Sequence, residues 1–164
     1  MEARVRLIPW IEGRCSMYAV VRDGVCLAEE FVSTLRKIDA DSERRLMRLI
    51  TALSNEALIR PAQLRPERPD RGVFAMYNHR EWRGEQYNPS RLLCSYVGAG
   101  NRTLLFGAGF VKTRDEPIQS NPEANREAVF LADIAQQVDR KIDHGEILVV
   151  GAELIPLFAD SFHF

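Results

Sequence analysis

The sequence Gly109-Phe110-Val111-Lys112-Thr113 decides the predicted fold, because it ends the second of two apolar stretches, residues 92–97 and 104–111. A turn at residues 98–101 (Gly-Ala-Gly-Asn) joins these stretches, so together they predict a β-hairpin. Both strands carry apolar side chains on both faces, which predicts a central position in a sheet that helices cover. Because Lys112 directly follows a buried strand, it is well placed to meet a phosphate.

The residues before the hairpin predict a strand and two helices. Residues 17–21 predict a short strand that ends at the turn Asp23-Gly24. Apolar residues spaced by three or four then predict two amphipathic helices. They are Leu27, Phe31, Leu35 and Ile38 in the first helix and Leu46, Leu49, Ile50 and Leu53 in the second. We expect Asp41 to cap the second helix, and the tight connection predicts an antiparallel pair.

The segment between the helices and the hairpin is interrupted by prolines. Pro61, Pro66 and Pro69 argue against regular structure there. Residues 73–77 then predict a strand, and residues 78–90 predict a long polar loop. Loops of that length often carry function.

A last helix is expected after the hairpin. Asn121 and Pro122 are expected to open it, and Gly145 to end it. Residues 146–150 then predict a short strand. The tail at residues 154–164 is apolar, so it must pack on its own domain, on a partner or on a second copy.

The resulting order, β-α-α-β-β-β-α, predicts an α+β fold. We expect a small antiparallel sheet with a helical pair and a C-terminal helix packed on it, the helices lying on one face. Three parts are expected along the chain: an irregular N-terminal segment (1–16), the domain itself (17–144) and an apolar C-terminal extension (145–164).

The composition is that of a globular protein. The chain has 164 residues, 46% of them apolar and 27% charged, which fits one domain with a sizeable core. It has neither an apolar run long enough to cross a bilayer nor the pattern of a signal peptide, so we expect no membrane partner and a cytoplasmic location. Three cysteines without a CxxC pair and three scattered histidines predict free thiols and no metal site.

Charge is unevenly distributed. The net charge of −1 argues weakly against a dedicated nucleic-acid binder. Residues 60–91, however, hold seven arginines against four acidic residues. Arginine suits bidentate phosphate recognition, although a solvated loop of mixed charge is the alternative interpretation.

In order and spacing, these segments resemble the RelE/HigB superfamily of toxins, and within it the phage-derived Gp49-like group. The matching segments are Gln63-Leu64-Arg65, Gly72-Val73-Phe74-Ala75-Met76, Arg91-Leu92-Leu93-Cys94-Ser95-Tyr96, Leu104-Leu105-Phe106 to Gly109-Phe110-Val111-Lys112-Thr113, Pro117 and the helix from Asn125. The resemblance covers the chain from Tyr18 to Lys141. Thr113 stands where the family often has the second lysine of a pair.

The resemblance implies an mRNA endoribonuclease of a type II toxin–antitoxin or prophage module. Such enzymes usually act at the ribosomal A site and are held inactive by a cognate antitoxin. The implied chemistry uses no metal and no cofactor. A base removes the 2′-hydroxyl proton, the oxygen attacks the adjacent phosphate, cations stabilise the added negative charge, and an acid protonates the leaving oxygen.

The resemblance also assigns roles by position. Arg91, Lys112 and His79 are the candidate catalytic residues, His79 because imidazole has an unperturbed pKa near 6.5. The candidate RNA-binding residues are Arg65, Arg80, Arg83 and Arg114.

Each assignment has a structural alternative. Arg91 could form an ion pair with an acidic residue of a helix, Lys112 could be an ordinary strand-end lysine, and His79 could be a solvent-facing loop residue. Tyr96 alternates with core residues, which favours packing. An inactive member of the same fold, acting as a protein-binding module or as a homodimer through its C-terminal tail, is the alternative function. A small-molecule enzyme is the weakest interpretation, because Gly98-Ala99-Gly100 lies in a hairpin turn and not before a helix.

Overall fold

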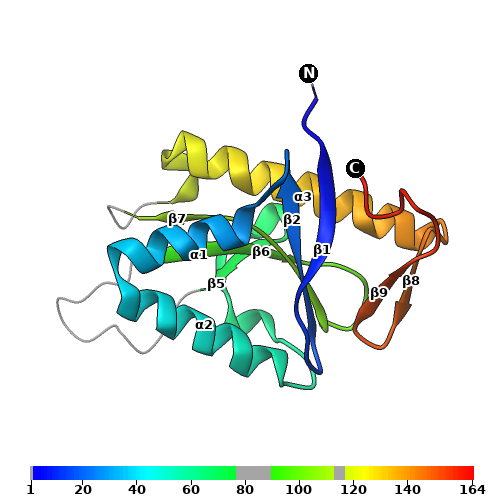
Figure 1. Cartoon of the computed structure of the whole chain (residues 1–164), viewed down its shortest axis with the longest axis horizontal. Coiled ribbons are helices and arrows are strands. Elements are labelled where there is room, and N and C mark those ends of the chain that lie inside the picture. Colours follow the sequence, from blue (N-terminus) through cyan, green and yellow to red (C-terminus); the bar gives the residue numbers. More distant parts are fainter. Residues whose placement is uncertain (1, 77–89, 113–116) are drawn as a thin grey trace.

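The computed structural model describes residues 2–76, 90–112 and 117–164. Its main sheet has seven strands in the order β1-β2-β7-β6-β5-β4, with the short β3 paired to β2 (Figure 1). The strands are β1 (Val5–Ile11), β2 (Ser16–Arg22), β3 (Val25–Cys26), β4 (Arg65–Arg68), β5 (Val73–Met76), β6 (Ser90–Tyr96) and β7 (Thr103–Val111). The helices are α1 (Leu27–Ile38), α2 (Ala40–Ser54) and α3 (Pro122–Asp143), and a separate hairpin follows from β8 (Ile147–Val150) and β9 (Glu153–Pro156).

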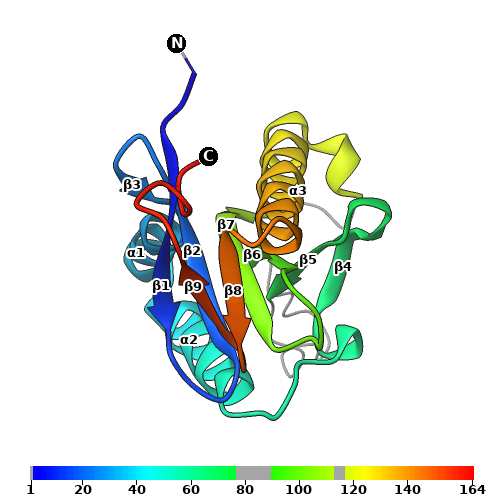
Figure 2. The same ribbon diagram turned by 90° about the vertical axis from the view of Figure 1, so that its right-hand side faces the viewer.

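The helices cover both faces of the sheet. Figure 2 shows α1 and α2 on one side of the strands and α3 on the other. Leu92, Cys94 and Phe106 face α1 and α2, while Leu93 and Leu105 face α3, as the alternation of side chains along a strand requires. The expected hairpin is therefore confirmed, and so is its central, doubly covered position. The expectation that all helices lie on one face is wrong.

The sheet is mixed, whereas the sequence predicted an antiparallel one. Residues Ser16 to Ala19 of β2 pair in parallel with Thr103 to Phe106 of β7. The two helices and four strands between them provide the long connection that parallel pairing needs. The observed class is α+β with a mixed sheet.

A β-bulge changes the direction of β7 at its midpoint. Leu92 pairs with Gly109 and Cys94 pairs with Phe106, so three residue steps on β7 match two on β6. The extra residue reverses the alternation: Gly107 packs against Leu131 of α3, and Gly109 packs against the ring of Phe31 on α1. Parallel pairing with β2 ends at the same point, as bulges commonly bring about.

The N-terminal half departs from expectation in three places. Residues 1–16 were expected to be irregular, but they contain β1, whose partner β2 lies across the turn that follows. The segment with three prolines contains β4, an edge strand in which Pro66 is tolerated because an edge leaves one side unpaired. Asp39, not Asp41, caps α2: its carboxylate accepts hydrogen bonds from the Ser42 amide (3.1 Å) and hydroxyl (2.7 Å).

The C-terminal tail packs on its own domain. Leu154 is buried, and its backbone hydrogen-bonds the Tyr18 hydroxyl. The last residues lie along β1: the Leu7 amide donates to the Phe162 carbonyl and the Phe164 amide donates to the Val5 carbonyl. Lys141 fixes this segment, since its ammonium donates to three carbonyls there and lies 4.3 Å from the centre of the Phe164 ring. We call residues 157–164 the C-terminal strap.

None of the helices in the described part of the chain has the length and apolar character needed to cross a bilayer. The three cysteines are free thiols, as expected.

Candidate functional site

Two predicted site residues lie at the same end of the central hairpin. Arg91 is the second residue of β6, and Lys112 follows the last residue of β7. Antiparallel pairing places Ser90 opposite Val111 and Arg91 opposite Phe110, so both cations lie where the two strands end together. Arg91 shares its face with Leu93, which is the face that α3 covers.

A buried carboxylate lies between these cations. Glu67 is the additional residue of a bulge in β4, because Pro66 pairs with Phe74 and Arg68 pairs with Val73. Its Oε2 lies 3.4 Å from the Lys112 Nζ. Its Oε1 lies 3.5 Å from the Nε of Arg91 and 3.4 Å from the Nε of Arg65. We call these four residues the cationic cluster.

The members of the cationic cluster differ in exposure. The side chain of Arg91 is fully buried, and those of Glu67 and Lys112 are exposed by 2% and 6%. Arg65 is 25% exposed and is the cation that most reaches solvent. A ligand at the surface would therefore contact Arg65 and the Lys112 ammonium before Arg91.

Burial and neighbouring cations act on the Lys112 ammonium. Desolvation lowers the pKa of Lys112 below 10.5, the nearby Glu67 opposes this shift, and the positive charges of Arg65 and Arg91 add to it. The cluster therefore combines a lysine whose pKa is lowered with guanidinium groups suited to phosphate.

Contacts within the cluster are long. Charge-assisted hydrogen bonds are usually about 2.7–2.9 Å between heavy atoms. The three contacts of Glu67 measure 3.4–3.5 Å, and its buried Oε1 accepts no hydrogen bond from the described residues. Coulombic attraction therefore contributes more to these three contacts than directed hydrogen bonds do.

Three of the seven predicted site residues come together in the cationic cluster: Arg65, Arg91 and Lys112. The other four, His79, Arg80, Arg83 and Arg114, lie outside the described residues. Within the described residues, no group of three or more His, Cys, Asp or Glu side chains is arranged to hold a metal ion.

The alternative roles of two residues are now defined. Arg91 does meet a carboxylate, but Glu67 belongs to a strand and not to a helix. Tyr96 donates to the Ile59 carbonyl at 2.6 Å, and its ring meets that of Phe74 edge to face. This packing role agrees with the prediction from the sequence, in which Tyr96 alternates with core residues along the strand.

Glu67 is the residue that sequence reasoning missed. It stands between Pro66 and Arg68 in a segment rich in arginine, where a carboxylate looks like one more surface charge. Only the pairing of β4 with β5, and the bulge within it, turns this side chain into the sheet. The only hint in the sequence was Pro66, because a proline within a strand indicates the edge of a sheet.

No family model, no curated protein and no solved structure matches this chain. Its own geometry is therefore the basis for a functional proposal.

Proposed function

We propose that this chain is a toxin-like mRNA endoribonuclease of a type II toxin–antitoxin or prophage module. One observation carries the proposal: Arg65, Arg91 and Lys112 converge on Glu67 at the end of the central hairpin. Phosphoryl transfer at an RNA backbone needs cations placed around the phosphate, and three cations around one carboxylate suit that task. The proposed partners are mRNA and a cognate antitoxin.

A RelE-like fold is part of the same proposal. Support comes from the chain order, in which a strand, two helices, a strand, the central hairpin and α3 follow one another. The proposal rests on this order of elements, to which β1, β3, β4 and the β8–β9 hairpin are additions, and the helices cover both faces of the sheet.

The proposed reaction is cleavage by the neighbouring 2′-hydroxyl. The 2′-oxygen loses its proton to a base and attacks phosphorus, the bond from phosphorus to the 5′-oxygen breaks, and that oxygen is protonated. The products are a 2′,3′-cyclic phosphate and a 5′-hydroxyl. Lys112 and Arg65 would stabilise the negative charge, and Arg91, which is fully buried, would position Glu67 beneath them. His79 is the proposed acid or base.

Cleavage of a 5′-labelled RNA by the purified chain tests the proposal. We expect a cyclic-phosphate product, and none from an RNA with 2′-deoxynucleotides throughout. Lys112→Met should lower kcat by about tenfold or more, because it removes a charge that acts on the transition state. Arg44→Ala is the matched control, since that arginine lies on α2 with its side chain 61% exposed.

Expression in a bacterial host gives a second readout. We expect wild-type chain and Arg44→Ala to arrest growth, and an Arg91→Ala/Lys112→Ala double variant not to. Robust growth and intact RNA with folded wild-type protein would exclude the proposal.

A second candidate function is a catalytically inactive protein of this fold that binds a partner or a second copy. The full burial of Arg91 favours it, and so does an apolar surface on the C-terminal hairpin and strap. The exposed apolar residues there are Leu148, Val149, Val150, Ile155, Leu157 and Phe158. The test is mass in solution, compared with that of a Val150→Lys/Phe158→Lys variant.

Substitution is a better test here than deletion. Removing residues 152–164 would also remove the buried Leu154 and the Ala152 carbonyl that Thr103 binds at 2.6 Å. A wild-type dimer that the double lysine variant converts to a monomer supports the second function. A monomer in both cases contradicts it.

A further inference from the structure

β2 and β7 separate after a short parallel contact. Their last pair is Ala19 with Phe106, and the bulge of β7 follows at once. Beyond this point β2 turns back into β3, which pairs with Val21 and Arg22. In Figure 1, β2 and β7 run in clearly different directions. β7 therefore continues to Val111 without β2 beside it.

A cleft of about 460 Å³ opens where the strands separate. It lies between α1, the second half of β7 and the start of α3, and its volume is in the range of sites that hold small ligands or peptide segments (about 300–1,000 Å³). Phe31, Ala108 and Phe110 supply apolar surface. Gly109 is required here, because a Cβ at this position would lie 2.2 Å from the Phe31 ring.

Within the described part of the chain, one edge of β7 has no strand paired to it inside this cleft. β6 pairs with β7 through Val111, but on the other edge the pairing with β2 stops at Phe106. Among the described residues, none hydrogen-bonds the backbone of β7 between Gly107 and Val111 from the side away from β6. Unpaired N–H and C=O groups on a strand edge form a template for another extended chain.

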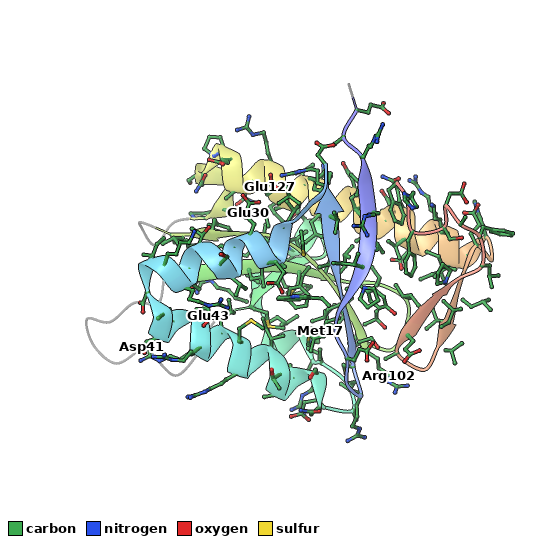
Figure 3. All side chains as sticks on the ribbon, viewed as in Figure 1. Met17, Glu30, Asp41, Glu43, Arg102 and Glu127 are labelled. Atoms are coloured by element: carbon green, nitrogen blue, oxygen red, sulfur yellow. The ribbon has the colours of Figure 1, made fainter. Side chains whose placement is uncertain are left out.

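The mouth of the cleft is acidic. Glu30 of α1 and Glu123 and Glu127 of α3 line it, together with one cation, Arg22. Figure 3 labels Glu30 and Glu127, which approach the cleft from the two helices. Arg22 binds Glu127 through two hydrogen bonds of 2.9 and 3.1 Å, so this pair is internally neutral. Glu30 and Glu123 form no ion pair with the described residues.

We propose that this cleft binds an extended segment of a partner protein, which adds to β7 as a strand and carries Lys or Arg toward Glu30 and Glu123. The unpaired edge selects a peptide backbone, the apolar floor takes side chains on one face, and the two carboxylates select positive charge. This inference is independent of the ribonuclease proposal, because the cationic cluster contributes no residue to the cleft.

Fluorescence anisotropy with a labelled peptide, acetyl-(Lys-Val)4-amide, tests the inference. We expect saturable binding to the full chain, and no binding of acetyl-(Glu-Val)4-amide. Methylating alternate backbone nitrogens of the basic peptide should weaken its binding by about tenfold, because methylation removes hydrogen-bond donors to the strand edge. Glu30→Gln and Glu123→Gln should each weaken binding of the basic peptide about two- to fivefold, as expected for charges at the rim of a binding site.

Thr34→Trp is the blocking variant, because Thr34 is exposed and lines the cleft. Thr51→Trp, exposed on α2 outside the cleft, is its matched control. We expect the first to abolish binding and the second to leave it unchanged.

Three outcomes would overturn the inference. One is equal binding of the basic peptide to both tryptophan variants. Another is equal binding of the methylated and unmethylated peptides. The third is self-association that Thr34→Trp abolishes while no peptide binds, which would make a second copy the occupant.

Discussion

The stability of the cationic cluster depends on a single carboxylate, that of Glu67. Glu67→Gln would keep the shape of this residue and leave Arg91 and Lys112 buried without their shared carboxylate. We expect a loss of about 3–5 kcal/mol in the free energy of unfolding, the usual cost of removing one partner from a buried ion pair. Urea denaturation at pH 7 measures it.

Glu43→Gln is the control for this prediction. Glu43 is also nearly buried, but its partner Arg36 is 63% exposed, so water can replace the lost carboxylate. We expect a cost of about 1 kcal/mol or less. Equal losses for the two variants would show that the cluster contributes no more than a surface pair.

Lys112 should make stability depend on pH in the alkaline range. Its pKa in the folded chain lies below 10.5, chiefly because of desolvation, so between that lowered pKa and 10.5 the unfolded chain binds more protons. Stability conferred by this group therefore rises with pH across that window. We expect the wild type to gain stability relative to Lys112→Met as pH increases toward 10.5, measured by urea denaturation at several pH values. A difference that stays constant or shrinks would contradict the assigned cause.

Gly109 tests the contact between β7 and α1. Gly109→Ala would place a methyl group 2.2 Å from the Phe31 ring, so the ring or the strand must move. Overpacking of this kind costs about 1–3 kcal/mol. Adding Phe31→Leu should recover part of the loss, and the double-mutant cycle measures this coupling. Additive losses would mean that the two residues do not meet.

Sequence reasoning could locate only some residues of the cationic cluster. Arg91 and Lys112 could be predicted, because a hairpin brings the start of one strand and the end of the next together. Glu67 could not, since its orientation depends on a bulge in a four-residue edge strand. Local sequence carries little information on where such an additional residue falls.

Among the elements, α2 depends on its N-terminal cap. Asp39 accepts two hydrogen bonds from Ser42, and these bonds lower the pKa of its carboxyl. Asp39→Ala should cost about 1 kcal/mol (range 0.5–2), while Asp41→Ala should change stability by less than about 0.5 kcal/mol. Because the folded pKa is the lower one, the wild-type advantage should be present above pH 3.8 and fade as pH falls below it. Equal effects of the two alanines, in thermal or urea unfolding, would contradict this assignment.

Elements with strong periodicity were the ones that sequence reasoning found. The apolar residues of α1, α2 and α3 recur every three or four positions, and those of the hairpin strands are continuous. β1 was missed, because Pro9 interrupts its pattern and its regular structure depends on β2 and the strap. β3 has two residues, too few for any periodicity. Parallel pairing of β2 with β7 joins residues more than eighty positions apart, which no local pattern records.

At the scale of the whole molecule, the C-terminal strap protects the outer edge of the sheet. It pairs with β1 through Leu7 and Val5, and Phe162 meets the Tyr18 ring edge to face. Deleting residues 159–164 should expose this edge and cause association that increases with concentration, which light scattering measures. Phe158→Ser is the control, since Phe158 is 60% exposed and forms no bond to β1. A truncated chain that stays monomeric at high concentration would show that β1 needs no cover.

The strap also brings the two ends of the chain beside each other, as Figure 1 shows, because Phe164 bonds to Val5. A short glycine-rich linker could join them, and new ends could be opened elsewhere without breaking the sheet. Gly151, in the turn between β8 and β9, has a left-handed backbone and open space around it. A circular permutant opened there would change the order in which the strands are synthesised and keep their arrangement in the sheet. It would show whether β1 must be made first for the sheet to form.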